Sequence, residues 1–93
     1  MHAHVRDWTV KVNIFEAGDD TVAHAVLLTE SPTRLQGRGH SRRGAADGAV
    51  PEIGDEVAVA RALRDLAAKL LDTAAGDIEA VTGERDVVLR PAE

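Results

Sequence analysis

The spacing of apolar side chains changes once along this chain, and that change limits the folds it can adopt. In residues 8–15 and 34–42 apolar or small residues alternate with polar ones, whereas from residue 55 to about residue 74 apolar residues recur every three or four positions. A period of two is typical of half-buried strands, and a period near 3.6 is typical of an amphipathic helix. We therefore predict an α+β fold, with three antiparallel strands packed on one long C-terminal helix.

The first two strands are predicted on either side of a turn that contains Gly18. Residues 8–15 alternate strictly, and Trp8 on the apolar side is expected in the core. Residues 21–29 form the second strand, which has two apolar faces. The face with the smaller side chains consists of Ala23, Ala25 and Leu27. We expect it to lie against the helix, because small side chains let a helix approach closely.

The opposite face of the second strand then forms an apolar patch on the open side of the sheet. An open antiparallel face is usually polar, so exposed apolar side chains there indicate a partner. We predict that the patch is the interface of a homodimer. Its members, with one aromatic residue from the first strand, are Phe15, Val22, Val26 and Leu28. A turn of one residue more or less would exchange the two faces.

The third strand is predicted over residues 34–42, where Gly37 and Gly39 indicate a bend or close packing of the helix. Its other side is basic, and residues 34–43 contain no acid in a chain of net charge -5. With one lysine from the first strand, the candidate phosphate-binding residues are Lys11, Arg34, Arg38, His40, Arg42 and Arg43. The alternative is a solvated edge strand that its charges protect against aggregation.

The helix is predicted from about Asp55, its capping residue, to residue 74 or 75. The expected core face consists of Val59, Ala60, Leu63, Leu66, Ala67, Leu70 and Leu71. Arg61 and Asp65 are expected to form an ion pair on the solvent side, because they are four residues apart. Gly76 is expected to end the helix, with a further helical turn or two over residues 77–81.

The length of 93 residues fits one domain. We expect a disordered tail at residues 1–7, the domain at 8–82 and a C-terminal extension at 83–93. The chain has no cysteine, which excludes disulfides and thiolate metal sites and fits a reducing cytoplasm. Stability then has to come from a thin core, for which self-association is a natural supplement. No apolar run approaches the length of a membrane span.

Catalytic chemistry is not expected. Ser41 and His40 are sequence neighbours on a strand, so their side chains point to opposite faces. Residues 37–39 lack the glycine spacing and the Lys-Ser/Thr ending of a phosphate loop. The four histidines offer no predictable set of three metal ligands. We therefore predict no enzyme, no metal, no cofactor and no small-molecule substrate.

The junction between the third strand and the helix carries the most distinctive motif, Val50-Pro51-Glu52-Ile53-Gly54-Asp55-Glu56. The other motifs are Trp8-Thr9-Val10, the Gly37–Arg43 run, Ala60-Arg61-Ala62-Leu63 and Asp77-Ile78-Glu79. Together they resemble a family of small actinobacterial proteins of unknown function, over about residues 8–79. The resemblance implies a βββα core similar to the double-stranded-RNA-binding domain, without the N-terminal helix of that domain.

The resemblance to this family does not imply RNA binding. Double-stranded-RNA binders place lysines at the start of the long helix, where Asp55 and Glu56 would here repel phosphate. Some members of the family are associated with dormancy or stress, and ribosome hibernation promoting factors have similar β-β-β-α sheets with basic surfaces. Two functions are therefore expected. One is a homodimeric stress- or dormancy-associated binding protein; the alternative is a ribosome or RNA binder that uses the Arg-rich third strand.

Overall fold

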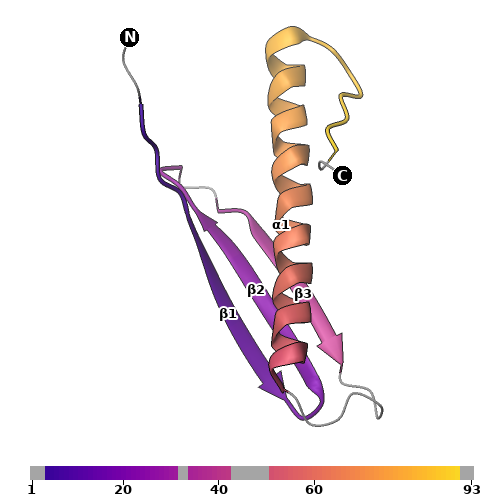
Figure 1. Cartoon of the computed structure of the whole chain (residues 1–93). Coiled ribbons are helices and arrows are strands. Elements are labelled where there is room, and N and C mark those ends of the chain that lie inside the picture. The colour runs from indigo at the N-terminus through magenta and orange to yellow at the C-terminus, as the bar shows by residue number, and fades with distance from the viewer. Residues whose placement is uncertain (1–3, 32–33, 43–50, 91–93) are drawn as a thin grey trace.

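The computed structural model, which describes residues 4–31, 34–42 and 51–90, has the predicted order of elements. The elements are β1 (Thr9–Ala17), β2 (Asp20–Leu28), β3 (Gln36–Arg42) and α1 (Pro51–Thr82). The strands form one antiparallel sheet in the order β1-β2-β3, and α1 lies across one of its faces (Figure 1). The α+β fold predicted from the change of periodicity is confirmed.

The turn between β1 and β2 fixes which side chains share a face. Gly18 has a φ of 61°, a left-handed conformation that glycine adopts without steric cost. The register that follows pairs Ala17 with Asp20 at the turn and Thr9 with Leu28 at the far end. Paired residues point to the same side of a sheet, so the even-numbered residues of β1 share a face with the odd-numbered residues of β2.

The core lies between α1 and the strands β2 and β3. Its buried members are mostly small: Ala23, Ala25, Leu27, Ala58, Ala62 and Leu66. The predicted orientation of β2, with Ala23, Ala25 and Leu27 toward the helix, is confirmed. No large side chain among the described residues is fully buried. Because hydrophobic stabilisation scales with buried apolar area, this core contributes little for a chain of this length.

The helix approaches β3 so closely that only glycine fits at positions 37 and 39 on the helix-facing side of the strand. A Cβ atom at Gly37 would collide with the carbonyl of Ala62 and the amide of Leu66, and one at Gly39 would collide with the carbonyl of Ala58 and the amide of Ala62. The close packing predicted from the two glycines is therefore confirmed. Ala58 and Ala62 complete the contact from the helix, because both are small and fully buried.

The position of α1 over β2 and β3 leaves the helix-facing side of β1 largely uncovered (Figure 1). Val10 and Ile14 on this side are 41% and 44% exposed. Trp8, just before the strand, is 58% exposed, so its predicted place in the core is wrong. The physical reason is that the glycines draw the helix toward β3 and away from β1.

The buried face of α1 is rotated from the predicted one. Leu66 is buried and Leu70 packs against the core, as expected. Three residues assigned to the core face are exposed instead: Ala60, Leu63 and Ala67. The helix turns its smallest side chains inward, because its main contact is with the backbone of the β3 glycines and not with larger side chains.

Both ends of α1 lie outside the predicted bounds. The helix begins at Pro51, which suits a first turn because its φ is fixed near the helical value, so Asp55 lies inside the helix and does not cap it. The predicted end at Gly76 is wrong, since the helix continues to Thr82. A single glycine costs a helix only about 1 kcal/mol relative to alanine, which neighbouring helix formers can offset.

The helix ends instead at Thr82 and is followed by Gly83, which has a φ of 77°. Its amide donates a hydrogen bond to the carbonyl of Glu79 at 2.8 Å, a common arrangement after the last turn of a helix. The chain then turns back alongside α1 (Figure 1), where the amide of Val87 donates to Oε1 of Glu79 at 3.0 Å.

Candidate functional site

The sheet face that points away from α1, called the open face below, gathers most of the predicted binding residues. Cross-strand pairing arranges its side chains in rungs from β1 through β2 to β3. The rungs are Lys11–Val26–Gln36, Asn13–His24–Arg38, Phe15–Val22–His40 and Ala17–Asp20–Arg42. Basic side chains of β1 and β3 therefore flank the half-buried side chains of β2.

The predicted basic residues fall into three groups. Lys11, Arg38, His40 and Arg42 are exposed on the open face. Arg34 is exposed but precedes β3, and Arg43 lies outside the described residues. Arg38 and Arg42 lie on one strand, where four steps separate their Cα atoms by about 13 Å.

A single acid faces these basic groups from the described strands. It is Asp20, whose Oδ1 lies 2.9 Å from Nε2 of His40. Both side chains are about half exposed, at 50% and 54%. Because Lys11, Arg38 and Arg42 outnumber this one acid, the open face has a positive charge although the whole chain has a net charge of -5.

The predicted apolar patch forms a narrow row along the open face. Val22, Val26 and Leu28 are half-buried, and His24 interrupts them on β2. Phe15 on the neighbouring strand is 58% exposed, and its ring meets that of His24 edge-on, with 5.5 Å between the ring centroids. The role of this row as a dimer interface stays a prediction.

Side chains of α1 bind the outer edge of β3, which no sequence pattern had indicated. Three hydrogen bonds make this contact: Arg61 Nη1 to the His40 carbonyl at 2.7 Å, the Arg38 amide to Asp65 Oδ2 at 2.9 Å, and Lys69 Nζ to the Gln36 carbonyl at 2.7 Å. The helix residues recur at every fourth position, so they form one row along α1. This row occupies backbone groups that an edge strand would otherwise present to another chain.

Asp65 is the centre of the row. Its Oδ2 also lies 3.0 Å from Nζ of Lys69, and this ion pair replaces the predicted pair with Arg61. The hydrogen bond from the Arg38 amide, followed by that from Lys69, lowers the pKa of Asp65 below its ordinary value of 3.8. The spacing of four placed these residues on one helix face, but it carried no sign that the face meets a strand edge.

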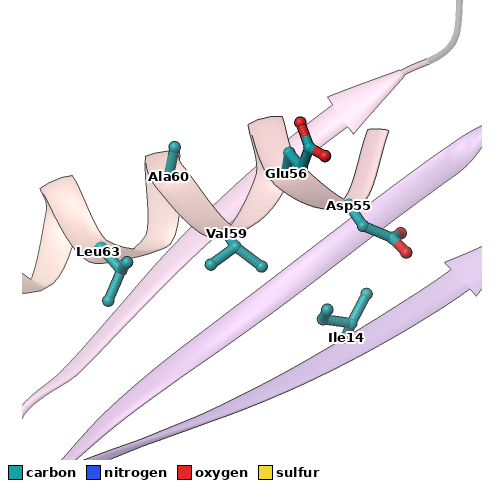
Figure 2. A pocket seen from close by; sticks show the side chains of 6 residues that line it. All are labelled: Ile14, Asp55, Glu56, Val59, Ala60 and Leu63. Carbon is teal, nitrogen blue, oxygen red and sulfur yellow. The ribbon is translucent and has the colours of Figure 1, made fainter. Parts of the chain in front are cut away.

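An apolar groove lies between β1 and the first half of α1 (Figure 2). Its volume is about 400 Å³, and its lining consists of Ile14, Asp55, Glu56, Val59, Ala60 and Leu63. Figure 2 shows the Val59 and Leu63 side chains pointing toward the sheet, with Ile14 facing the helix from β1. Asp55 lies at one end of the groove, and its Oδ1 is buried without a hydrogen-bond partner in the described part of the chain.

The residues examined for catalysis have structural contacts. Ser41 is buried, and its Oγ donates to the carbonyl of Gly54 at 2.7 Å, which fixes the start of α1 against β3. Within residues 4–31, 34–42 and 51–90, no three metal-ligating side chains come together. In the same part of the chain, no helix is both long enough and apolar enough to cross a membrane.

These features define a class: small α+β proteins in which three antiparallel strands are followed by one long helix that leaves an open sheet face. Within that class, the chain belongs to the Rv2632c-like family, whose model matches residues 6–87. The chain is 46% identical over 78 residues to the uncharacterized protein MT1780 of Mycobacterium tuberculosis, covering 84% of this chain and 82% of the relative. It is 39% identical over 69 residues to the uncharacterized protein Rv2632c of the same species, covering 74% of each.

A crystal structure of Rv2632c has the same fold. It superposes with a TM-score of 0.81 at 37% sequence identity, covering 90% of this chain and 99% of that one. The mycobacterial relatives agree with the actinobacterial family that the sequence motifs resemble. The likeness to the double-stranded-RNA-binding domain stays a prediction.

Proposed function

We propose that this protein is a non-enzymatic binding module that acts as a homodimer in the cytoplasm during stress or dormancy. The homodimer is supported by one observation, the exposed apolar groove between β1 and α1. Ile14 and Leu63, on its two walls, are 44% and 42% exposed. The absence of cysteine supports the cytoplasmic location. The role in stress or dormancy rests on the family resemblance.

The accessible surface area of the single chain is larger than that of a compact monomer, which supports self-association. The chain exposes 7486 Å², whereas a compact monomer of 9.9 kDa exposes about 5,200 Å². The radius of gyration of 17.0 Å likewise exceeds the value of about 12 Å for a compact domain of this length. Part of the excess comes from the exposed segments before β1 and after α1, and from the part of α1 that extends beyond the sheet (Figure 1). A standard interface needs about 800 Å² per partner, which this excess can supply.

Sedimentation velocity on the full chain tests the homodimer. A dilution series at micromolar concentrations is expected to show a species of twice the chain mass that dissociates on dilution. A monomer at every concentration would contradict the proposal. Deleting the gene in the source organism tests the biological role, with reduced survival of nutrient or oxygen limitation and normal growth as the expected result. Equal survival of both strains would contradict it.

We propose RNA binding, as in a ribosome-associated protein, as a second candidate function. It is supported by the open face, where Lys11, Arg38 and Arg42 are exposed. The one acid that the described strands place on this face, Asp20, is paired with His40. Contacts from such side chains to phosphates provide affinity without sequence selectivity. Phe15 offers one exposed ring for base stacking. The acidic start of α1 argues against the duplex-binding mode in which lysines occupy that position.

Filter binding with RNA and co-pelleting with ribosomes test this second function. The double variant Arg38→Ala/Arg42→Ala is expected to lose binding and to reduce the slope of log affinity against log salt by about 0.7 to 0.9 per lost phosphate contact. Arg64→Ala/Arg85→Ala is the matched control, because it removes the same charge from exposed residues outside the strands. Equal losses in both variants, or no binding of the wild type at low salt, would contradict the proposal.

A further inference from the structure

We propose that two copies of this chain join through the outer edges of their β1 strands, so that two three-stranded sheets become one antiparallel sheet. The inference rests on the homodimer proposed above and names its interface. Val12 lies on the twofold axis, and Val10 of one copy pairs with Ile14 of the other. This interface differs from the open-face row predicted from sequence.

The hydrogen bond between β2 and the β3 side shows which residues of β1 direct their backbone N–H and C=O groups away from the sheet. The amide of Leu27 on β2 donates to the carbonyl of Leu35 on the β3 side at 2.9 Å. Successive residues of an antiparallel strand direct their backbone groups to opposite sides, so the even-numbered residues of β2 face β1. Their β1 partners are odd-numbered. Val10, Val12 and Ile14 therefore direct their N–H and C=O groups away from the sheet, as a template for another strand.

The opposite edge of the sheet is not available for the same pairing. Three outward backbone groups of β3, the carbonyls of Gln36 and His40 and the amide of Arg38, are bound by the row of Arg61, Asp65 and Lys69 from α1. A strand that added at β3 would have to displace all three side chains and separate the Asp65–Lys69 ion pair. Within the described residues, β1 is the edge that can accept a strand at no such cost.

The side chains of β1 are self-complementary in one register. When Val12 lies opposite Val12 of the second copy, Val10 lies opposite Ile14 and Lys11 lies opposite Asn13. The apolar pairs then fall on the helix-facing side, where Val10 and Ile14 are 41% and 44% exposed in a single chain. Cross-strand apolar pairs of this kind are the unit that stabilises a sheet.

The neighbouring registers match less well. A twofold axis through Lys11 would set two like charges directly opposite each other, which is destabilising. An axis through Asn13 would set Val10 opposite Glu16, and so place an apolar side chain against a carboxylate. A shift by a single residue in the pairing would bring the helix-facing side of one β1 against the open side of the other.

The same register brings the second copy to the groove. In this register its Trp8 lies opposite Glu16, two residues beyond Ile14 on the wall of the groove. Trp8 is 58% exposed in a single chain, and an indole usually seeks both apolar cover and an acceptor for its N–H.

Disulfide trapping tests the edge and its register, because the chain has no natural cysteine. Val12→Cys places one thiol on the twofold axis, opposite its own copy at a Cα separation of about 5.5 Å, which a disulfide can span. We expect nearly complete conversion to a covalent dimer under mild oxidation. Thr9→Cys is the matched control, because the two copies of residue 9 would lie about 20 Å apart along the strands and should not cross-link.

The outcomes separate the interface from the homodimer itself. Cross-linking by Asn13→Cys and not by Val12→Cys would overturn the proposed register. If Thr9→Cys cross-linked as efficiently as Val12→Cys, the disulfides would come from random collision, and the proposed pairing of the β1 edges would be overturned. A dimer in sedimentation with no cross-link at residues 10–14 would overturn edge pairing and leave the homodimer standing. A monomer in sedimentation would overturn both. As Trp8 is the only tryptophan, its fluorescence should shift to the blue as the dimer forms, and an unchanged spectrum would remove it from the interface.

Discussion

Substituting alanine for the two glycines at residues 39 and 76 should change stability in opposite directions. A Cβ atom at residue 39 would collide with backbone atoms of Ala58 and Ala62 in α1, which cannot rotate out of the way as a side chain can. The helix would have to move outward along the contact that contains most of the core. At Gly76, nothing lies within 4 Å of the added atom.

The expected magnitudes follow from these two surroundings. Overpacking costs 1–3 kcal/mol when side chains can adjust, and a backbone collision belongs at the upper end, so Gly39→Ala should lose about 3 kcal/mol. Gly76→Ala replaces an exposed helical glycine, so it should gain about 1 kcal/mol. For a domain of this size, 1 kcal/mol moves Tm by about 4–8 °C. The two variants should therefore melt about 16–32 °C apart.

Thermal unfolding followed by far-UV circular dichroism measures this difference, with urea unfolding as a second determination of the free energy. All proteins are compared at one concentration, because the Tm of a dimer depends on it. A Gly39→Ala variant as stable as the wild type would refute the close contact between α1 and β3. A Gly76→Ala variant that lost stability would refute the continuous helix.

Three further substitutions test separate contacts. Because the folded-state pKa of Asp65 lies below its ordinary value of 3.8, its carboxylate stabilises the fold above that pH and loses this effect as the pH falls through the lowered pKa. Asp65→Asn should therefore melt lower than the wild type at neutral pH and lose less stability on acidification, and parallel profiles of Tm against pH would contradict this. Ser41→Ala removes a buried hydrogen bond to Gly54, so urea unfolding should show a loss of about 1 kcal/mol, and an unchanged midpoint would argue against the bond. Gly83→Ala forces a β-carbon into a left-handed conformation and should lower Tm by an amount that corresponds to about 1 kcal/mol, whereas a rise in Tm would contradict the described helix end.

The order of elements and the facing of β2 could be predicted from the sequence, because both depend on local periodicity. Ala23 and Ala25 identified the helix-facing side, and Gly37 and Gly39 indicated the close approach of the helix. These predictions succeeded because small residues leave a recognisable signal wherever two backbones come together.

The sideways position of the helix on the sheet could not be predicted in the same way. Leu63 and Trp8 were assigned to the core because they are large and apolar, yet the helix lies over β3 and leaves both exposed. Helical periodicity identifies an apolar stripe but not the strand that receives it. For the same reason, the hydrogen bonds from Arg61 and Lys69 to the backbone of β3 could not be predicted. A row of charged residues on a helix has the same sequence pattern whether it faces water or a strand edge.

The unequal edges of the sheet limit how far self-association can proceed. A sheet with two open edges can accept a new copy at each end and grow into a filament, as in fibrous aggregates. Here Arg61, Asp65 and Lys69 of α1 bind three backbone groups at the β3 edge of the same sheet and so obstruct pairing there. In the proposed dimer the two outermost strands would both be β3 strands obstructed in this way, so the assembly is expected to stop at two chains. In that dimer the side chains of α1 would allow the exposed β1 edge to be used for pairing without further polymerisation.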